Sequence, residues 1–361
     1  MKKGKSSNIS VNLPSFSMMK KKRIIAAIMI IASALLLGMF LIYNILFRPK
    51  LNTGKERIVL YIPEGATYTQ ALDTIKSHFT IPHLRIFEWI AEKKNYPALV
   101  KPGRYVIDND LSYNNLINIL RSGRQTPVNV TFNNVRTLND LAGKVSKQIA
   151  ADSVSLVNFL SDPDNYSDDG FSKETVIAVF LPNTYQFFWN TDAEGFYSRM
   201  LREYNKFWNG ERVAKAKAKK LTQVDVSIIA SIIDDEVAKA DEKPRIAGVY
   251  LNRLKRGIPL QACPTIKFAL NDWTITRVLT AYLEVDSPYN TYKHYGLPPG
   301  PIGCASIEGI DAVLNAEKHD YLFFAARADF SGYHNFSRTL TEHNRYAAEY
   351  QRELNKRKIY R

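Results

Sequence analysis

The chain has 361 residues, of which 45% are hydrophobic and 23% are charged, as in ordinary globular proteins. The length allows two modest domains beside a membrane segment. The net charge of +14 raises the question of nucleic-acid binding, but seven of the basic residues lie before residue 24 and the others are dispersed. The sequence has no zinc-type Cys/His spacing and no phosphate-binding glycine loop. We therefore expect no metal, no cofactor and no nucleic-acid partner.

An uncharged apolar run covers residues 24–47. It is long enough to span a hydrocarbon core of roughly 30 Å. Because Lys20–Arg23 precede it, the positive-inside rule places residues 1–23 in the cytoplasm. A cleaved signal peptide is the alternative, since Ala32-Ser33-Ala34 has the form of a cleavage site, but the run is long for one. We predict a basic cytoplasmic tail (1–23), disordered over residues 1–22, a single-pass anchor in the cell (inner) membrane (24–47) and an extracytoplasmic, periplasmic remainder.

Residues 55–126 are predicted to form a small α+β module. The expected order is strand, helix, helix, strand, helix, over residues 57–62, 68–78, 83–94, 104–107 and 112–121. Thr67 and Ser112 suit helix N-caps, and Gly123 suits a helix stop. A soft boundary at 124–127 then leads into a larger α+β domain over residues 127–361.

The larger domain is predicted to combine helices, polar loops and short strands. Expected helices and strands cover residues 128–132, 138–149, 154–160, 194–208, 306–316, 321–325, 333–336 and 341–356, with loops at 260–268, 289–292 and 296–302. Its central helix is expected at 224–239, because no Pro or Gly interrupts the helical spacing of apolar residues there.

The central helix carries a carboxyl on its apolar side. At roughly 100° per residue, Glu236 projects from the middle of the apolar stripe, whereas Asp234, Ser227 and Ser231 project from the polar side. A carboxyl on a core face must be neutralised, paired or partly hydrated in a cleft. Burial raises its pKa toward that of a general acid working near neutral pH. The alternative is a structural carboxylate paired with a buried arginine.

Glycosidases ordinarily use two carboxylates. Asp225 shares the face of Glu236 but lies roughly 16 Å away by helix rise, beyond either spacing of a glycosidase pair. Glycan chemistry here would therefore use one carboxyl. Polar and aromatic residues elsewhere suit a sugar cleft, although each one alone is more often a turn or core residue. These candidate substrate-binding residues are Asn183, Thr184, Tyr185, Gln261, Thr265, Tyr289, Asn290, Thr291, Tyr292 and Asn335.

Six segments, in order, resemble the endolytic murein transglycosylases of the MltG (YceG-like) family: 230–236, 247–254, 259–265, 289–292, 296–302 and 334–336. A further family motif resembles residues 181–185, with Asn183 where Asp is usual. The resemblance implies one N-terminal anchor, a LysM-like module at 55–126 and a YceG-like catalytic domain at 127–361. It also places the catalytic acid/base on Glu236 and adds Asn252 to the substrate-binding set.

The family reaction, by this resemblance, is non-hydrolytic. It cleaves the β-1,4 bond between N-acetylmuramic acid and N-acetylglucosamine within a glycan strand and leaves 1,6-anhydro ends. The nucleophile is the muramic C6 hydroxyl, which explains why a second carboxylate is not required, and its tethering lowers the entropic cost of attack. Peptidoglycan strands, the membrane and peptidoglycan synthases are the implied partners. The alternatives are a non-catalytic wall-binding or scaffolding protein and a hydrolytic muramidase.

The two cysteines lie in segments implied to border one cleft. Cys263 stands where the family usually has Asp before Pro264-Thr265, and Cys304 follows the Gly-Leu-Pro-Pro-Gly loop. A Cys263–Cys304 disulfide bracing the cleft is predicted, with two unrelated buried thiols as the alternative. The departure at Cys263 leaves open what replaces the family Asp.

Overall fold

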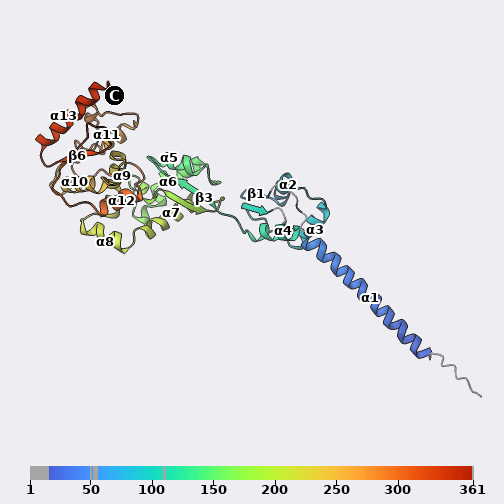
Figure 1. Ribbon diagram of the computed structural model, residues 1–361. Helices are drawn as coiled ribbons and strands as arrows, with labels where there is room; N and C mark the ends of the chain where they lie inside the picture. Colours follow the sequence, from blue (N-terminus) through green and yellow to red (C-terminus); the bar gives the residue numbers. More distant parts are fainter. Residues whose placement is uncertain (1–15, 49–50, 52–55, 109–110, 360–361) are drawn as a thin grey trace, which may run out of the picture. The chain divides into compact units, whose positions relative to one another are not determined.

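A computed structural model of the chain describes residues 16–48, 51, 56–108 and 111–359 (Figure 1). The chain divides into two compact units, residues 1–126 and 127–361. Within the described residues, helices are combined with three antiparallel two-stranded sheets. The predicted α+β class is therefore confirmed.

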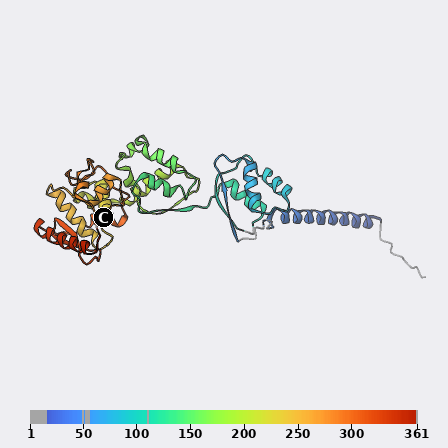
Figure 2. The same cartoon turned by 90° about the horizontal axis from the view of Figure 1, so that it is seen from above.

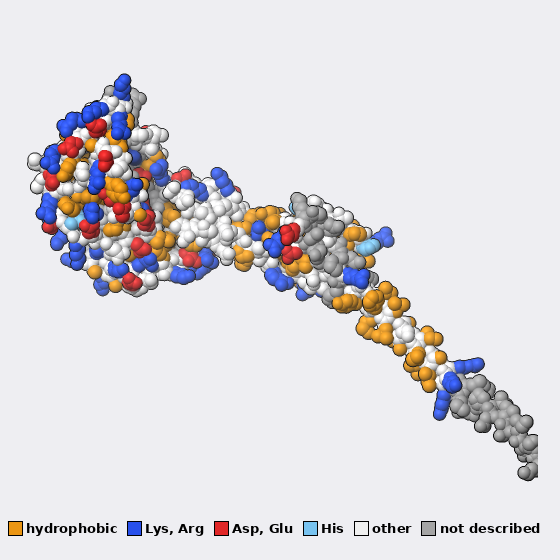
Figure 3. Space-filling view, in the orientation of Figure 1, with side chains coloured by type: hydrophobic (Ala, Val, Ile, Leu, Met, Phe, Trp, Pro, Cys, Tyr) orange, Lys and Arg blue, Asp and Glu red, His pale blue; other side chains and the backbone are white. Residues whose placement is uncertain are grey.

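The apolar run forms one long helix, α1 (Phe16–Phe47). Its segment Lys20–Asn44 has a mean hydropathy of 2.8 and is the one stretch of the described chain long and apolar enough to cross a membrane. Figure 3 shows apolar side chains along α1 and basic side chains at its N-terminal end. A membrane anchor and a signal sequence both fit this helix. The predicted disordered tail was too long, because residues 16–23, rich in the helix formers Met and Lys, belong to α1; residues 1–15 lie outside the described chain.

The first unit has the predicted order of elements after α1: β1 (Arg57–Ile62), α2 (Tyr68–His78), α3 (Leu84–Lys93), β2 (Gly103–Asp108) and α4 (Tyr113–Ser122). Strands β1 and β2 pair antiparallel. Thr67 and Gln70 form a capping box that starts α2, and the Ser112 hydroxyl caps α4. Gly123 ends α4 with a φ of 69°, which glycine adopts without strain.

The second unit contains the remaining elements (Figures 1 and 2). They are β3 (Val128–Phe132), α5 (Leu138–Val145), α6 (Ser153–Ser161), β4 (Asn183–Phe187), α7 (Ala193–Phe207), α8 (Gly210–Ala218), α9 (Gln223–Glu236), α10 (Lys243–Lys255), α11 (Cys263–Leu270), α12 (Ile307–Leu314), β5 (Phe323–Ala326), β6 (His334–Ser337) and α13 (Leu340–Lys356), with four short 3₁₀ turns at 163–165, 167–169, 176–179 and 280–284. The loop predicted at 260–268 was wrong in part, because α11 begins at Cys263 with Pro264 in its first turn, where proline is tolerated.

Helix α9 is the centre of this unit and packs against α8, α10, α11 and α12. Residues 226–233 are all buried, so the predicted polar side of the helix does not exist there. Ser227 and Ser231 are buried because their hydroxyls donate to the carbonyl oxygens of Gln223 and Ile228 inside the same helix.

The two ends of α9 are set by local chemistry. Asp225 completes a capping box with Thr222, which gives that acid a structural task at the start of the helix. The helix ends at Glu236, three residues earlier than predicted, because Val237 adopts extended backbone (φ −139°, ψ 130°).

Candidate active site

Glu236 is the last residue of α9, and its side chain is half-buried. Burial raises the pKa of its carboxyl to about 7; the charge of Lys267 lowers it and that of Asp235 raises it. The partial negative charge at a helix C-terminus acts in the same direction as burial, because it disfavours a carboxylate. Near neutral pH this carboxyl can therefore both give and accept a proton.

No described residue forms a hydrogen bond or an ion pair with the Glu236 carboxyl. Arg253 is buried on α10, but its guanidinium donates to the carbonyl oxygens of Pro259 (2.9 Å) and Leu322 (2.9 Å) and to the side chain of Gln261. The alternative of a carboxylate locked to a buried arginine is thus not the arrangement in this structure. The carboxyl oxygens of Glu236 are therefore not engaged by any described residue.

Three side chains from other elements lie close enough to Glu236 for its charge to raise their pKa values. Burial is the largest cause in each case. The Cys263 thiol has a pKa of about 11 and lies 3.2 Å from the Tyr292 hydroxyl. Tyr250 is 1% exposed, and its hydroxyl has no hydrogen-bond partner among the described residues. These three neighbours of Glu236 thus stay uncharged at neutral pH.

The unpartnered Tyr250 hydroxyl leads to a stability prediction. The Tyr250→Phe variant should be as stable as wild type or more stable, by up to about 1 kcal/mol, because it removes a buried polar group that lacks a partner. The matched Tyr292→Phe variant should lose about 0.5–1.5 kcal/mol, because its hydroxyl contacts the Cys263 thiol. Urea denaturation of both variants provides the measurement. A clear destabilisation by Tyr250→Phe would show that its hydroxyl is bonded.

The raised pKa of Glu236 has a second consequence, for stability against pH. An acid with a folded-state pKa of about 7 and an unfolded value near 4.5 stays protonated longer in the folded protein, so stability falls as pH rises between these values. The loss should reach about 3 kcal/mol by pH 8. The Glu236→Gln variant cannot ionise there. Its stability relative to wild type should therefore increase from pH 4 to pH 8 in denaturation experiments, and a pH-independent difference would contradict this assignment.

Three of the predicted substrate-binding residues are buried and support loops. Thr265, Asn290 and Thr291 are at most 2% exposed. The Thr265 and Thr291 hydroxyls lie 2.8 Å apart, and the Asn290 amide donates to the carbonyl oxygens of Leu283 and Val285. They cannot contact a sugar in this conformation, because their polar atoms are used inside the protein.

Five other predicted residues, two neighbouring tyrosines and three residues of strand β4, differ in burial and in contacts. Tyr289 packs on Phe268, with ring centroids 4.5 Å apart, and Tyr292 contacts Cys263. In β4, the Tyr185 side chain is buried and donates to the Leu181 carbonyl oxygen. Asn183 and Thr184 are exposed, with Thr184 bonded across the sheet to Thr131. Of the five predicted residues in this paragraph, Tyr185 therefore belongs to the core, whereas Asn183 and Thr184 lie at the surface.

The last three predicted residues lie on different elements. The Asn252 amide donates to the carbonyl oxygens of His319 and Tyr321 and so fixes α10 to the segment before β5. Gln261 is exposed, has a φ of 51° and accepts from Arg253. Asn335 is half-buried in β6, where it pairs with Ala325.

The predicted disulfide is wrong for this structure, in which Cys263 and Cys304 are both free thiols. The reason is that they belong to different surroundings. Cys263 lies at the start of α11 against Tyr292, near Glu236. Cys304 is buried beside the loop after β3, where its N–H donates to the Val135 carbonyl oxygen.

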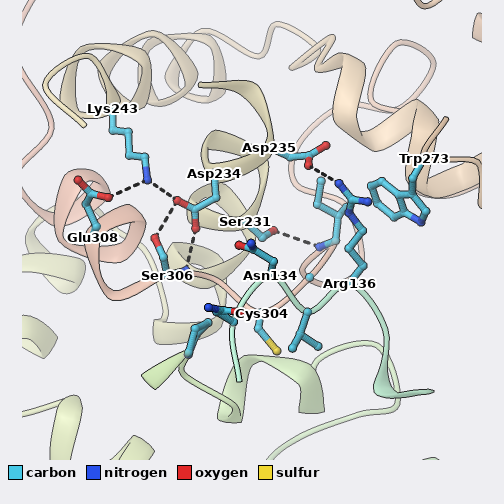
Figure 4. A pocket seen from close by; sticks show the side chains of 15 residues that line it. Asn134, Arg136, Ser231, Asp234, Asp235, Lys243, Trp273, Cys304, Ser306 and Glu308 are labelled. Atoms are coloured by element: carbon cyan, nitrogen blue, oxygen red, sulfur yellow. Dashed lines mark hydrogen bonds and ion pairs between the residues drawn. The ribbon is translucent and has the colours of Figure 1, made fainter. Parts of the chain in front are cut away.

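The sequence predicted Asp234 on the polar, solvent-exposed side of α9. In the structure its side chain is only 21% exposed. Its carboxylate accepts from Lys243 Nζ (2.8 Å) and from the backbone N–H (2.7 Å) and hydroxyl (2.8 Å) of Ser306, as Figure 4 shows. Burial alone would lower the pKa of Lys243, but Asp234 and Glu308 together hold that pKa above its usual value. A Cβ on Gly309 would lie 2.6 Å from Asp234 Oδ1, so only glycine allows α12 this close.

A cavity of about 350 Å³ opens beside the same turn of α9 (Figure 4). Glu236 is not among its lining residues, which are Asn133, Asn134, Val135, Arg136, Pro182, Ser231, Asp234, Asp235, Lys243, Trp273, Ile302, Gly303, Cys304, Ser306 and Glu308. Arg136 Nη2 lies 3.3 Å from Asp235 Oδ1, and the guanidinium lies 4.2 Å from the centroid of the Trp273 ring. Arg136 and Trp273 were not predicted as site residues, because neither belongs to a recognisable motif.

The chain belongs to the YceG-like family, whose sequence model matches residues 60–349. It is 29% identical over 329 residues to an endolytic murein transglycosylase of Bacillus subtilis, covering 87% of this chain and 90% of that protein. It is 28% identical to an endolytic murein transglycosylase of Streptococcus pneumoniae, covering 82% of this chain but only 59% of that protein. A crystal structure of a putative yceG-like protein from Listeria monocytogenes matches with a TM-score of 0.54 and 26% identity, over 80% of this chain and 98% of that one. The family resemblance inferred from the sequence is confirmed.

Proposed function

We propose that this protein is a lytic transglycosylase that cleaves the MurNAc-β-1,4-GlcNAc bond within peptidoglycan strands, with Glu236 as the general acid/base. The observation that carries the proposal is the Glu236 carboxyl itself. It is desolvated, has a pKa of about 7 and forms no ion pair with any described residue. The names of the related proteins from Bacillus subtilis and Streptococcus pneumoniae support peptidoglycan as the substrate.

In the proposed reaction, protonated Glu236 donates its proton to the leaving glycosidic oxygen as the C1–O bond breaks. The resulting carboxylate then accepts the proton of the muramic C6 hydroxyl, whose oxygen bonds to C1 and closes the 1,6-anhydro ring. Water is not consumed, and the carboxyl ends protonated as it began. A pKa near the working pH serves both halves of this cycle. One carboxyl is sufficient because the substrate supplies the nucleophile.

The proposal includes the placement of the chain in the cell. Helix α1 anchors the protein in the cell membrane, residues 1–23 face the cytoplasm, and residues after the helix lie in the periplasm or its equivalent. The strand-helix-helix-strand-helix unit at 55–126 is a LysM-like module that holds glycan, and residues 127–361 are the catalytic domain. Peptidoglycan synthases are the proposed neighbours. A reporter enzyme fused to the C-terminus tests the orientation.

Product analysis tests the reaction. Purified full-length protein in detergent is incubated with purified sacculi, and the released fragments are identified by mass spectrometry. Anhydro-muramic ends are the expected products. Reducing muramic ends would instead indicate a hydrolytic muramidase. Strand binding without any release would indicate a wall-binding protein.

A further inference from the structure

The cavity beside α9 has two charged groups with spare bonding capacity, and Figure 4 shows them on opposite sides. On one side, the side chain of Glu308 is 55% exposed, and its one hydrogen bond or ion pair with a described residue is the 3.1 Å pair to Lys243. On the other side, the side chain of Arg136 is 44% exposed. Of the other charged lining residues, Lys243 pairs with both Asp234 and Glu308, and Asp235 pairs with Arg136.

The guanidinium of Arg136 is positioned by two contacts. It lies over the Trp273 ring, and its contact to Asp235 uses one of its five N–H groups. The other side-chain N–H groups have no acceptor among the described residues. A planar guanidinium with an open edge matches a carboxylate, which it can bind through two parallel hydrogen bonds.

Between these two charges lies an amide. Figure 4 shows Asn134 in the middle of the cavity. The side-chain amides of Asn133 and Asn134 have no hydrogen-bond partner among the described residues, and Asn134 has a φ of 47°. A primary amide offers both donors and an acceptor, as a peptide bond requires. A sugar fits less well, because Arg136 already covers one face of the Trp273 ring.

We propose that this cavity binds the short peptide attached to muramic acid, with Arg136 receiving a peptide carboxylate and Glu308 receiving the amine of its diamino acid. This inference rests on the proposed function and deepens it, because it names the part of the substrate that lies beyond the sugars. The position supports it. Asp235 lines the cavity and directly precedes Glu236 in the last turn of α9. Their side chains diverge by roughly 100°, but an extended peptide of four residues spans roughly 13 Å, so a peptide on a muramic acid at Glu236 is long enough to pass the end of the helix and enter the cavity.

Binding is tested in the full-length Glu236→Gln background, which separates affinity from cleavage. Isothermal titration calorimetry uses a synthetic stem tetrapeptide and two blocked forms, one with amidated carboxylates and one with an acetylated amine. We expect Arg136→Gln to weaken binding of the free peptide at least about tenfold, the scale of a lost charge-assisted hydrogen bond. Arg136→Lys, which keeps the charge but not the fork, should restore part of this loss.

The blocked peptides make the assignment specific to atoms. Amidation of the carboxylates should weaken binding to the parent but add little in Arg136→Gln, because both changes remove the same contact. Acetylation of the amine should show the same non-additivity with Glu308→Gln. Arg345→Gln is the matched control, since Arg345 also lies over an aromatic ring, Tyr346, but on α13 outside the cavity lining.

The inference would be overturned if the Glu236→Gln parent and its Arg136→Gln variant bound the free peptide with equal affinity. It would also be overturned if the parent bound the amidated peptide as tightly as the free one. Competition by peptide-free glycan strands would reassign the cavity to sugar. These outcomes are independent of the proposed reaction. If wild type releases anhydro products but does not bind the peptide, only this inference fails; if Glu236→Gln still cleaves strands, the catalytic assignment fails instead.

Discussion

The Glu236→Gln variant is expected to bind glycan strands and to lose at least about 10²-fold, and up to about 10⁴-fold, of the rate at which anhydro-muramic ends are released from sacculi. Glutamine has nearly the same shape but can neither donate a proton to the glycosidic oxygen nor accept one from the C6 hydroxyl. The fold should persist, because the surroundings of Glu236 already favour an uncharged group. Quantitative mass spectrometry of released fragments provides the rate.

The control for this experiment is Glu194→Gln, which changes an exposed carboxyl in the first turn of α7. Its release rate should equal that of wild type. Circular dichroism and strand pull-down confirm that both variants fold and bind. Wild-type release by Glu236→Gln would reject Glu236 as the catalytic residue, whatever other acid then replaced it.

The second large effect is expected at Asp234, where alanine should lower the free energy of unfolding by about 3–5 kcal/mol. The change removes three hydrogen bonds. It also leaves Lys243, only 6% exposed, with the largely exposed Glu308 as its remaining partner among the described residues. A buried ammonium that loses its better partner is costly, and Ser306, which caps α12, loses its anchor as well. Urea denaturation at neutral pH measures the change.

The adjacent acid is the matched comparison for Asp234. Asp235 makes one contact, 3.3 Å long, with the half-exposed Arg136. Its replacement by alanine should therefore cost below about 1 kcal/mol, as expected for a solvated ion pair. If both alanine variants lose the same stability, Asp234 is not the structural carboxylate of this turn.

Features set by nearby residues were predictable from the sequence. The helices of the first unit begin at Thr67 and Ser112 because each caps its own helix within three residues. The position of Glu236 on the core side of its helix likewise depends only on helical periodicity. Its raised pKa then follows from burial.

Features set by distant residues were not predictable. Asp234 is structural because Ser306, 72 positions later in the chain, lies against it, and no periodicity contains that pairing. Thr265 and Thr291 likewise looked like cleft residues until their hydroxyls were seen to bond to each other. The two cysteines appeared able to pair because the motifs imply that both segments border the cleft. The motifs do not show in which direction each thiol points.

The last turn of α9 gives three consecutive acids three separate destinations: Asp234 to α12 and Lys243, Asp235 to Arg136, and Glu236 to none of the described cations. Adding or deleting one residue within this turn would rotate every later side chain by roughly 100° about the helix axis. Each acid would then occupy the position of its neighbour and lose its own contacts. A substitution at one of these positions leaves the contacts of the other two in place, whereas a change in the length of the turn alters all three.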